Sequence, residues 1–450
     1  MPTPPFPGSV PAARLTGTTT RIALEGAFLM ALDVIRASHD RNPNTTTKHD
    51  NHHQGLPPRS GDSMTKPRTP TLVLTIALAL LIGACSQPDI TLRDDSDQIA
   101  RSSYQSPPHT IAQGLANPRG ITVAPNGTVF VAEAGLGGDG TCFDGPEGKV
   151  CFGLSGAVTR IDANGPTRVI EGLPSLAGDG GALATGPHGI SLLGTGNLYL
   201  TTGLGADPAV RDELLADSGL GMLWRANHTR GTVRAIADLA AFEATENPDG
   251  TAVDSNPYGV IAVPGGQAIT DAGGNSVLFV NAAGRVETLA VLPPQMVPAP
   301  AFLDLPDGTE IPMESVPTSV ARGPDGAYFV GVLTGFPFPV GGASVFRVVP
   351  GAEPTVYATG FTNIIDVTFG PDDALYVLEI TTNGLLAASD PTNPDLRGAL
   401  HRVLDGTTTT ILGPDDGLIA PGGIAFGPRG ELYITNLSVF PFGEVLSIEP

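Results

Sequence analysis

The feature that most constrains the fold is a motif that recurs six times along the chain. Each copy contains a short apolar strand, a tight turn of the Pro-Asn-Gly or Pro-Asp-Gly kind, and a second apolar strand, which is typical of a β-hairpin. The copies are "NPRGITVAPNGTVFVAE" (117–133), "GPHGISLLGTGNLYLTT" (186–202), "NPYGVIAVPGGQAITDA" (256–272), "VPTSVARGPDGAYFVGV" (316–332), "NIIDVTFGPDDALYVLE" (363–379) and "APGGIAFGPRGELYITN" (420–436).

Each hairpin is followed by further strand-like segments. A third segment such as "GAVTRID" (156–162) or "GALHRVL" (398–404) comes after the hairpin, and a fourth such as "TRVIEGL" (167–173) or "TVYATGF" (355–361) usually follows. Units of four strands bury both of their faces only by stacking around an axis. The sequence therefore predicts an all-β, six-bladed propeller with four-stranded blades over residues 106–450.

The two ends of this region predict how the ring closes. The last copy ends at Pro450, directly after its third strand, and "HTIAQGL" (109–115) precedes the first copy and has the fourth-strand pattern. We expect this segment to complete the sixth blade and so to remove an open sheet edge. A β-sandwich or a solenoid is the alternative, but neither explains a last strand that is supplied from the N-terminal side.

An export signal precedes the repeats. The apolar run from Thr71 to Ala84 is shorter than the ~20 residues that a membrane-spanning helix needs, it follows a methionine and two cationic residues, and it ends in a sequence that resembles a lipobox. We expect 64–84 to be a lipoprotein signal peptide, Cys85 to carry lipid, and 85–105 to be a flexible tether. The alternative is a buried helix that ends in Cys85. The expected location is extracytoplasmic and membrane-anchored, in the periplasm or at the cell surface.

Residues 1–63 have no periodic pattern that suggests a folded domain. We interpret them as a disordered extension or as the product of a translation start assigned too early, with Met64 as the natural start. His49, His52 and His53 resemble a metal-binding tract. A folded extension ahead of a signal peptide would block export, so we assign these histidines no metal.

The net charge limits the classes of molecule that the protein can bind, and the cysteines predict a disulfide. The chain has 24 Lys and Arg against 45 Asp and Glu, with a net charge of −21, which argues against nucleic acid as a partner. We expect a monomer that binds a small molecule or an extracytoplasmic protein. After Cys85 the only cysteines are Cys142 and Cys151, and in an oxidising compartment they are expected to form a disulfide.

A binding site is expected at one end of the propeller channel. The inner strand of a blade starts and the second strand ends at the same rim, and the long connections gather there, where binding usually resides on a rigid scaffold. The residues at the ends of the second strands are Glu133, Thr202, Asp271, Val332, Glu379 and Asn436. Those at the starts of the inner strands are Arg119, His188, Tyr258, Thr318, Ile365 and Gly422, and Asp366 replaces the usual glycine in the fifth blade.

The acidic members of these rings suggest a metal. Convergent carboxylates repel one another unless a cation neutralises them, and oxygen ligands favour Ca²⁺. The expected ligands are Glu133, Asp271, Asp366 and Glu379. The alternative is that each acid bonds to backbone N–H groups or to Arg119. For His188 the alternative is a packed, hydrogen-bonded side chain.

Several segments resemble one family. The stretches "GLANPRGITVAPNGTVFVAEAGLGGDG" (114–140), "SGAVTRI" (155–161) and "SNPYGVIAV" (255–263) followed by "DAGGN" (271–275) resemble the ScyD/ScyE family of exported six-bladed propellers, which is related to NHL-repeat and TolB-like propellers. The resemblance covers about 108–450, and Thr318 and Ile365 depart from its Pro-x-Gly pattern. It implies fold and export and supplies no reaction.

Three functions are compatible with these features. The first is a non-catalytic binding module, since motifs of nucleophilic, zinc or phosphate-binding sites are absent from the sequence. The second is a Ca²⁺-dependent hydrolase of the gluconolactonase type, which the acidic ring would support. The third, a quinoprotein dehydrogenase, requires a cationic pocket with histidines, for which only Arg119 and His188 are available.

Overall fold

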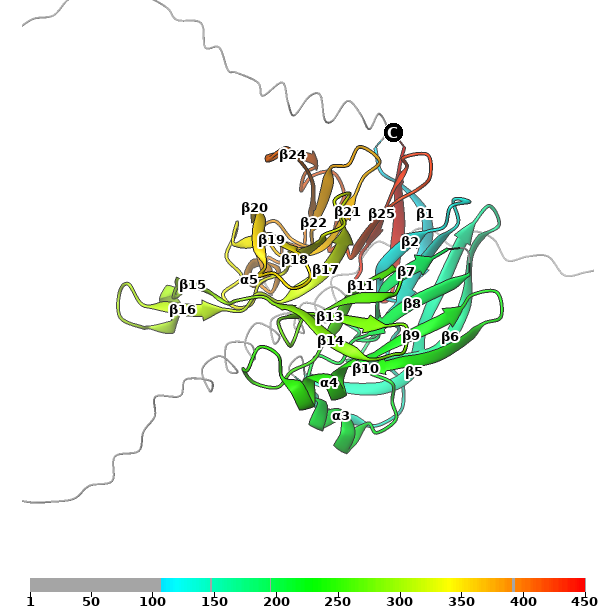
Figure 1. The fold of residues 1–450 in the computed structure, drawn as a ribbon, viewed down its shortest axis with the longest axis horizontal. Coiled ribbons are helices and arrows are strands. Elements are labelled where there is room, and N and C mark those ends of the chain that lie inside the picture. The colour runs from blue at the N-terminus through cyan, green and yellow to red at the C-terminus, as the bar shows by residue number, and fades with distance from the viewer. Residues whose placement is uncertain (1–106, 146–147, 195, 391–392, 450) are drawn as a thin grey trace, which may run out of the picture. The chain divides into compact units, whose positions relative to one another are not determined.

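The computed structural model describes residues 107–145, 148–194, 196–390 and 393–449, all within one compact unit. Its main strands form six four-stranded antiparallel sheets (Figure 1). The predicted six-bladed β-propeller is therefore confirmed. Among the described residues, no helix has both the length and the apolar character to cross a bilayer. The predicted signal peptide, the lipidated Cys85, the tether and the histidines of 49–53 lie outside the described residues.

The first three blades follow one another along the chain. Blade one contains β2 (Pro118–Val123), β3 (Val129–Glu133), β5 (Gly148–Asp162) and β6 (Gly165–Ala177), with β4 (Cys142–Gly145) paired to β5. Blade two contains β7 (Pro187–Leu193), β8 (Asn197–Thr202), β9 (Met222–Asn227) and β10 (Thr232–Asp238). Blade three contains β11 (Pro257–Val263), β12 (Gly266–Asp271), β13 (Ser276–Asn281) and β14 (Val286–Val291).

The remaining blades repeat the pattern. Blade four contains β17 (Pro317–Arg322), β18 (Tyr328–Val332), β19 (Ala343–Val348) and β20 (Thr355–Phe361). Blade five contains β21 (Ile364–Phe369), β22 (Leu375–Glu379), β23 (Ala399–Leu404) and β24 (Thr407–Leu412). Blade six contains β25 (Gly423–Phe426), β26 (Leu432–Asn436), β27 (Gly443–Ile448) and β1 (His109–Leu115).

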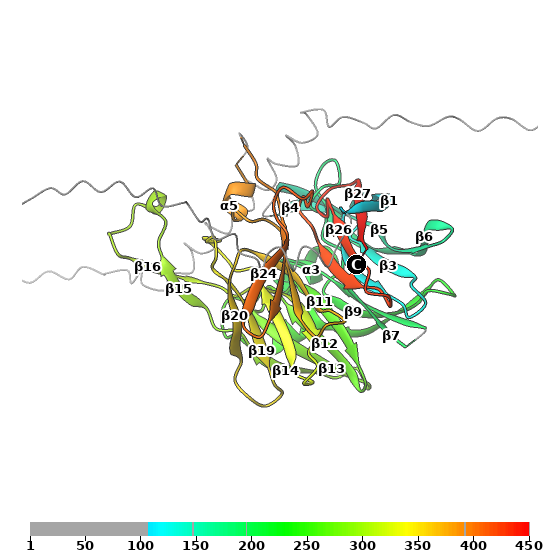
Figure 2. The same ribbon diagram turned by 90° about the horizontal axis from the view of Figure 1, so that it is seen from above.

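The ring closes as the sequence predicted. Strand β1 pairs antiparallel with β27, so that Leu115 lies opposite Gly443, and Figure 2 shows the two strands side by side. Each innermost strand contacts the innermost strand of the next blade, and β25 contacts β2. The N-terminal strand thus protects what would otherwise be the free edge of the last blade.

The glycine of the Pro-x-Gly motif allows this close approach of inner strands. A Cβ atom on Gly189 would lie 2.4 Å from the carbonyl oxygen of Tyr258 in the next blade, and one on Gly120 would lie 2.7 Å from the carbonyl oxygen of His188. Carbon atoms do not approach backbone oxygens so closely. The glycine of the motif is therefore required by the packing of each blade against the next.

The hydrophobic core lies between the blades. Second strands such as β3 and β18 are buried along their whole length, whereas the outer strand β20 is mostly exposed. One cluster joins Val277, Val330 and Val377 from three successive blades. Stacked apolar faces of this kind supply most of the stability of a propeller.

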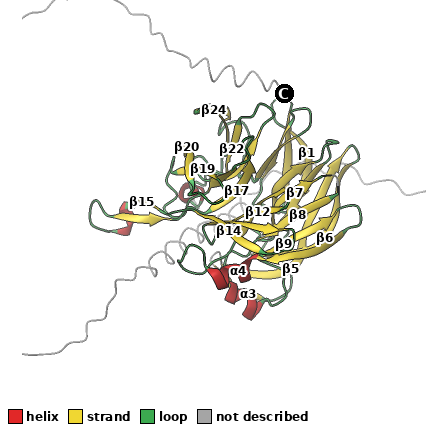
Figure 3. Cartoon of the chain, viewed as in Figure 1, coloured by secondary structure: helices red, strands yellow, loops and turns green. Residues whose placement is uncertain are grey.

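Several insertions extend from the connections. They are α3 (Pro208–Leu214), α4 (Leu239–Glu246), the short helix η1 (Ala301–Leu303), α5 (Leu385–Ala388) and the hairpin of β15 (Gln295–Pro298) and β16 (Glu310–Met313). Figure 3 shows α3 and α4 close together, and Figure 1 shows the hairpin projecting away from the blades. The long connection 293–315 is thus partly paired.

The first long connection, 134–155, is also partly paired. Much of 134–155 is strand, because β4 pairs with the extended start of β5 and places Cys142 opposite Cys151. The two cysteines form the predicted disulfide.

Candidate functional site

The register of the inner hairpins places the two predicted rings at one rim. Pro118 lies opposite Glu133, Pro257 opposite Asp271, and Ile364 opposite Glu379. The start of each inner strand therefore lies beside the end of the second strand of the same blade. The long connections leave from this rim, including those that carry the disulfide and α3.

The residues at the ends of the second strands, which we call the second-strand ring, hold the backbone before the inner strands in place. Glu133 accepts a hydrogen bond from the N–H of Ala116 at 2.7 Å, and Glu379 accepts one from Thr362 at 2.7 Å. In blade six the Asn436 side chain accepts from Ile419 at 2.7 Å. The three N–H donors occupy equivalent positions. Each lies three residues before the residue at the start of the inner strand of its blade, and we call those residues the inner-strand ring.

Asp271 performs the same role with a shorter side chain. Its carboxylate accepts hydrogen bonds from the N–H of Asn256 at 2.6 Å, the hydroxyl of Ser255 at 2.7 Å and the N–H of Gly274 at 3.3 Å. Burial raises the pKa of Asp271, and these hydrogen bonds oppose that rise. The loop before each of these inner strands is therefore fastened to the end of the second strand, which is the alternative that the sequence left open.

The ion pair of Glu133 involves a residue that the sequence did not suggest. Arg168 on β6 donates from Nε at 3.1 Å and from Nη2 at 2.7 Å to the fully buried carboxylate, and Thr159 donates to it as well. Arg119 instead donates from Nη2 to the carbonyl oxygen of Ala184 at 2.8 Å. No repeat signal marks Arg168, because it lies on an outer strand whose pairing is interrupted by bulges.

Thr202 and Val332 are the remaining two members of the second-strand ring. The Thr202 hydroxyl donates to the carbonyl oxygen of Gly219 at 2.7 Å and accepts a hydrogen bond from the Trp224 indole at 3.0 Å. Val332 is fully buried. Glu379 also lies 3.3 Å from His401 Nε2 within its own blade.

The predicted calcium ligands do not converge. Glu133, Asp271 and Glu379 are each directed at backbone and side-chain groups of their own blade, as described above. In the part of the chain that the structure describes, no three His, Cys, Asp or Glu side chains are placed to hold a metal ion together. A calcium ion shared by Glu133, Asp271, Asp366 and Glu379 therefore has no support from their positions.

The inner-strand ring, by contrast, gathers a polar cluster. Arg119 is 8% exposed and His188 is 3% exposed. The ring centroids of His188 and Tyr258 are 4.4 Å apart, and Arg119 interacts with the Tyr258 phenol. Blades one, two and three thus contribute three neighbouring side chains to the rim. We call Arg119, His188, Tyr258 and Asp366 the rim cluster.

Two nitrogens of the rim cluster have no hydrogen-bond partner among the described residues, Arg119 Nε and His188 Nδ1. Burial, together with the charge of Arg119, lowers the pKa of His188 to about 3, although the backbone of Pro257 accepts a hydrogen bond from the ring. The imidazole is therefore neutral near pH 7. It offers an acceptor nitrogen close to the donors of a fixed guanidinium.

Asp366 adds a carboxyl group from blade five. Its two oxygens accept hydrogen bonds from the N–H groups of Val367 and Ile424, both at 2.9 Å, and the second of these bonds crosses to blade six. Burial raises the pKa of Asp366 to about 7 in spite of these donors. Asp366 and Tyr258 each keep part of their surface exposed.

The other members of the inner-strand ring are structural. The Thr318 hydroxyl donates to the carbonyl oxygen of Ile364 at 2.7 Å, and Ile365 is buried in the core of blades five and six. A side chain at Gly422 would collide with Ser438. The polar rim therefore covers about half of the ring.

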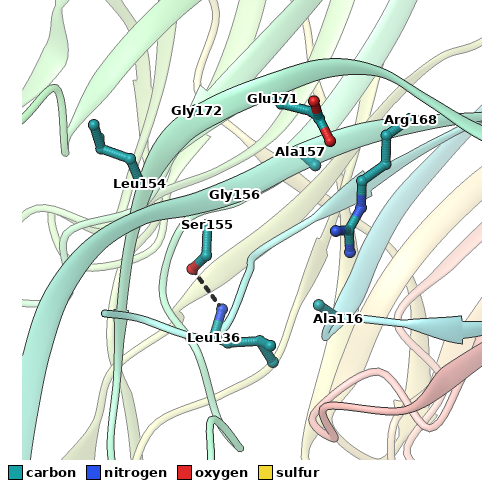
Figure 4. Close-up of a pocket in the computed structure, with 9 residues that line it drawn as sticks. All are labelled: Ala116, Leu136, Leu154, Ser155, Gly156, Ala157, Arg168, Glu171 and Gly172. Atoms are coloured by element: carbon teal, nitrogen blue, oxygen red, sulfur yellow. Dashed lines mark hydrogen bonds between the residues drawn. The ribbon is translucent and has the colours of Figure 1, made fainter. Parts of the chain in front are cut away.

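A separate small pocket lies on blade one beside Arg168 (Figure 4). Its volume is about 140 Å³, well below the roughly 300 Å³ of typical ligand pockets. The pocket is lined by Ala116, Leu136, Leu154, Ser155, Gly156, Ala157, Arg168, Glu171 and Gly172. Because Glu133 already neutralises its only cation, Arg168, we consider the rim cluster the better candidate.

The sheets and the rim define the protein as a six-bladed β-propeller with a polar cluster at the loop-rich end of its channel. No protein-family model matches the chain, and the comparison with curated proteins finds no match either. The resemblance to the ScyD/ScyE family stays a prediction.

Solved structures of propellers are similar to the chain at low identity. Virginiamycin B lyase from Staphylococcus aureus is 17% identical with a TM-score of 0.41, covering 71% of this chain and 78% of the other. A putative gluconolactonase is 13% identical with a TM-score of 0.44, covering 77% and 94%. Regucalcin from Agrobacterium tumefaciens is 13% identical with a TM-score of 0.41, covering 76% and 93%. Likenesses at this level carry no information on activity.

Proposed function

We propose that the protein is a binding module that captures a small polar molecule at the rim cluster. The observation that carries the proposal is the meeting of a fixed guanidinium, a neutral imidazole, a phenol and a weakly acidic carboxyl group at the rim, with two nitrogens unpartnered among the described residues. Buried polar groups without partners are costly. Both nitrogens are themselves buried, so a ligand would reach them only if the side chains of the rim moved, and it would then gain free energy by satisfying them.

The chemistry of the cluster selects a class of ligand. Arg119 and Tyr258 are donors that suit a carboxylate or carbonyl oxygen, whereas His188 Nδ1 accepts a hydrogen bond from a hydroxyl group. A small hydroxy acid, or another molecule with both groups, fits this combination. The resemblance to the ScyD/ScyE family, which stays a prediction from the sequence, would agree with a module that has no assigned reaction.

The test is a thermal-shift and calorimetric comparison of hydroxy acids with their methyl esters and amides. We expect acids to raise the unfolding midpoint of the parent protein and Arg119→Gln to abolish the effect. Arg234→Gln is the matched control, because Arg234 lies exposed on the outer strand β10. Equal shifts for both variants, or no shift with any compound, would contradict the proposal.

The alternative is a Ca²⁺-dependent lactonase or esterase, and one observation favours it. A carboxyl group with a pKa of about 7, as in Asp366, suits general acid or base catalysis. The methyl esters in the same panel test this reading. Ester hydrolysis that requires added Ca²⁺ and is lost in Asp366→Asn would establish the hydrolase, and binding without turnover would support the module.

We further propose that the module is tethered outside the cytoplasm through a lipidated Cys85. The support is the coincidence of cationic residues, an apolar run and a lipobox-like sequence before Cys85. Expression from Met64 should give a membrane-associated protein, and Cys85→Ala should release it or leave it unprocessed. Membrane association of that variant equal to the parent's would refute the anchor.

A further inference from the structure

Away from the rim cluster, four carboxylates surround the turn between β12 and β13. This turn runs from Ala272 to Asn275. It is approached by Glu243 of α4, by Asp249 and Asp254 of the loop after α4, and by Asp271. We call these four residues the turn cluster. The sequence did not suggest it, because three of the four lie in an insertion that occurs in only one blade.

The contacts of the turn show how close the carboxylates are to it. The position that a Cβ of Gly274 would occupy is 2.6 Å from Glu243 Oε2, and the corresponding position at Gly273 is 2.8 Å from Asp254 Oδ1. Asn275 Nδ2 donates to Asp249 Oδ2 at 3.0 Å, and Gly274 donates to Asp271 at 3.3 Å. The two glycines leave room for the acidic groups to face the turn.

Glu243 differs from the other members of the turn cluster because its carboxylate is buried without a hydrogen-bond partner in the described chain. Its side chain is fully buried, and neither carboxylate oxygen has a hydrogen-bond partner among the described residues. Asp249 and Asp271, by contrast, are bonded to their own loops. A buried carboxylate without donors costs several kcal/mol unless it is protonated or bound to a cation.

Other unpartnered oxygens lie along the same segment. Asn247 ends α4 in the left-handed conformation, and its side-chain nitrogen donates to the carbonyl oxygen of Thr251 at 2.8 Å. Asn247 Oδ1 and the hydroxyl of Ser276, which directly follows the turn, are buried without a partner in the described chain. An unsatisfied carboxylate, amide oxygen and hydroxyl in one loop system match the ligand preferences of a hard cation.

The charges that dominate the electrostatics of Glu243 are those of other acidic residues. The charges acting on Glu243 are those of Asp271, Asp249 and Asp254, and they add to burial in raising its pKa to about 8. Arg211, which packs near the start of α4, is paired with Asp212 and Asp238 at 2.9 Å and 2.8 Å. The turn cluster therefore concentrates negative charge inside the fold.

From these contacts we infer that the turn cluster becomes a site for one hard divalent cation such as Ca²⁺, with Glu243 and Asn247 as its central ligands. In the described part of the chain no three of its acidic side chains are already placed to hold a metal ion together, so the cation itself would complete the site. A bound cation would draw Asp249 and Asp254 toward Glu243 by removing their mutual repulsion. Such a site differs from the ring of carboxylates at the rim, with which it shares only Asp271. It would fix α4 and the following loop against blade three.

The competing explanation is a Glu243 that is permanently protonated and binds nothing. The variant Glu243→Gln separates the two, because glutamine imitates the neutral acid but is a poor ligand for Ca²⁺. Glu246→Gln is the matched control, since Glu246 is exposed on the same helix.

The experiment is titration of CaCl₂ into the chelator-treated full-length protein, followed by calorimetry and by the thermal unfolding midpoint. We expect Ca²⁺ to bind and to raise the midpoint of the parent and of Glu246→Gln, and to leave Glu243→Gln unchanged. A second variant, Asn247→Gly, preserves the left-handed helix end and should weaken binding by roughly tenfold or more. No effect of millimolar Ca²⁺ on the parent, or an undiminished effect on both Glu243→Gln and Asn247→Gly, would overturn the inference.

Discussion

The carboxyl group of Asp366 makes a sharp prediction about how stability varies with pH. Burial in the rim cluster raises its pKa from 3.8 to about 7. Between these two values the native state holds a proton that the unfolded chain has released. The free energy of unfolding must therefore fall as pH rises through this window and level off above pH 7.

The magnitude follows from the width of the window. Each pH unit between the two pKa values contributes about 1.36 kcal/mol, so ionisation of Asp366 removes about 4 kcal/mol in all. In Asp366→Asn this contribution is absent. The amide keeps only one acceptor oxygen for the N–H groups of Val367 and Ile424, and the donor left unpaired costs about 1–3 kcal/mol at every pH.

These two effects have opposite signs, so the stability curves of parent and variant should cross. We expect Asp366→Asn to be less stable than the parent at pH 4 and equally or more stable at pH 8. Urea unfolding followed by the fluorescence of the single tryptophan, Trp224, at half-unit steps of pH measures the difference. Asp179→Asn, an exposed aspartate, is the control. Parallel curves for parent and Asp366→Asn would refute the reasoning, because contributions from other groups cancel in the comparison.

Three further predictions concern the scaffold. Arg168→Gln should destabilise the protein by about 3 kcal/mol or more, and Glu133→Gln should destabilise it less. The reason is that the first change leaves a carboxylate that is 0% exposed without its cation, whereas the second leaves a guanidinium that is 42% exposed. Equal losses in denaturant unfolding at pH 7 would contradict this prediction. Gly189→Ala should cost about 3 kcal/mol because its Cβ meets the next blade, whereas Gly196→Ala meets no atom within 4 Å and should be nearly neutral; similar unfolding midpoints would disprove it. Replacing Cys142 and Cys151 by serine should remove about 2–3 kcal/mol and abolish the response of the midpoint to reductant.

The parts of the fold that could be predicted from the sequence are those that repeat. The inner hairpin of every blade has to solve the same packing problem, so Gly120 and Gly189 recur at equivalent positions and reveal both the blade count and the register. The closing strand β1 could be recognised for the same reason, since the sixth blade lacked one element.

The parts that could not be predicted occur once. Helix α4 and the hairpin of β15 and β16 are insertions without a counterpart in other blades, so no comparison along the chain marks them. The pairing of Glu133 with Arg168 joins the second strand of blade one to its outer strand, where bulges interrupt the register between β5 and β6. Spacing alone could not separate Arg168 from Arg119 as the partner of that acid.

The same distinction bears on where binding sites should be sought in this protein. Glu133, Glu379 and Asn436 occur at equivalent positions because in each of these blades the loop before the inner strand needs an acceptor for a free N–H. Repetition here indicates a structural role. Arg119, His188, Tyr258 and Asp366 share equivalent or neighbouring positions but differ in residue type from blade to blade, and packing does not require those differences. Side chains that break the repeat, at the rim and in the turn cluster, are therefore the ones whose substitution should change binding more than stability.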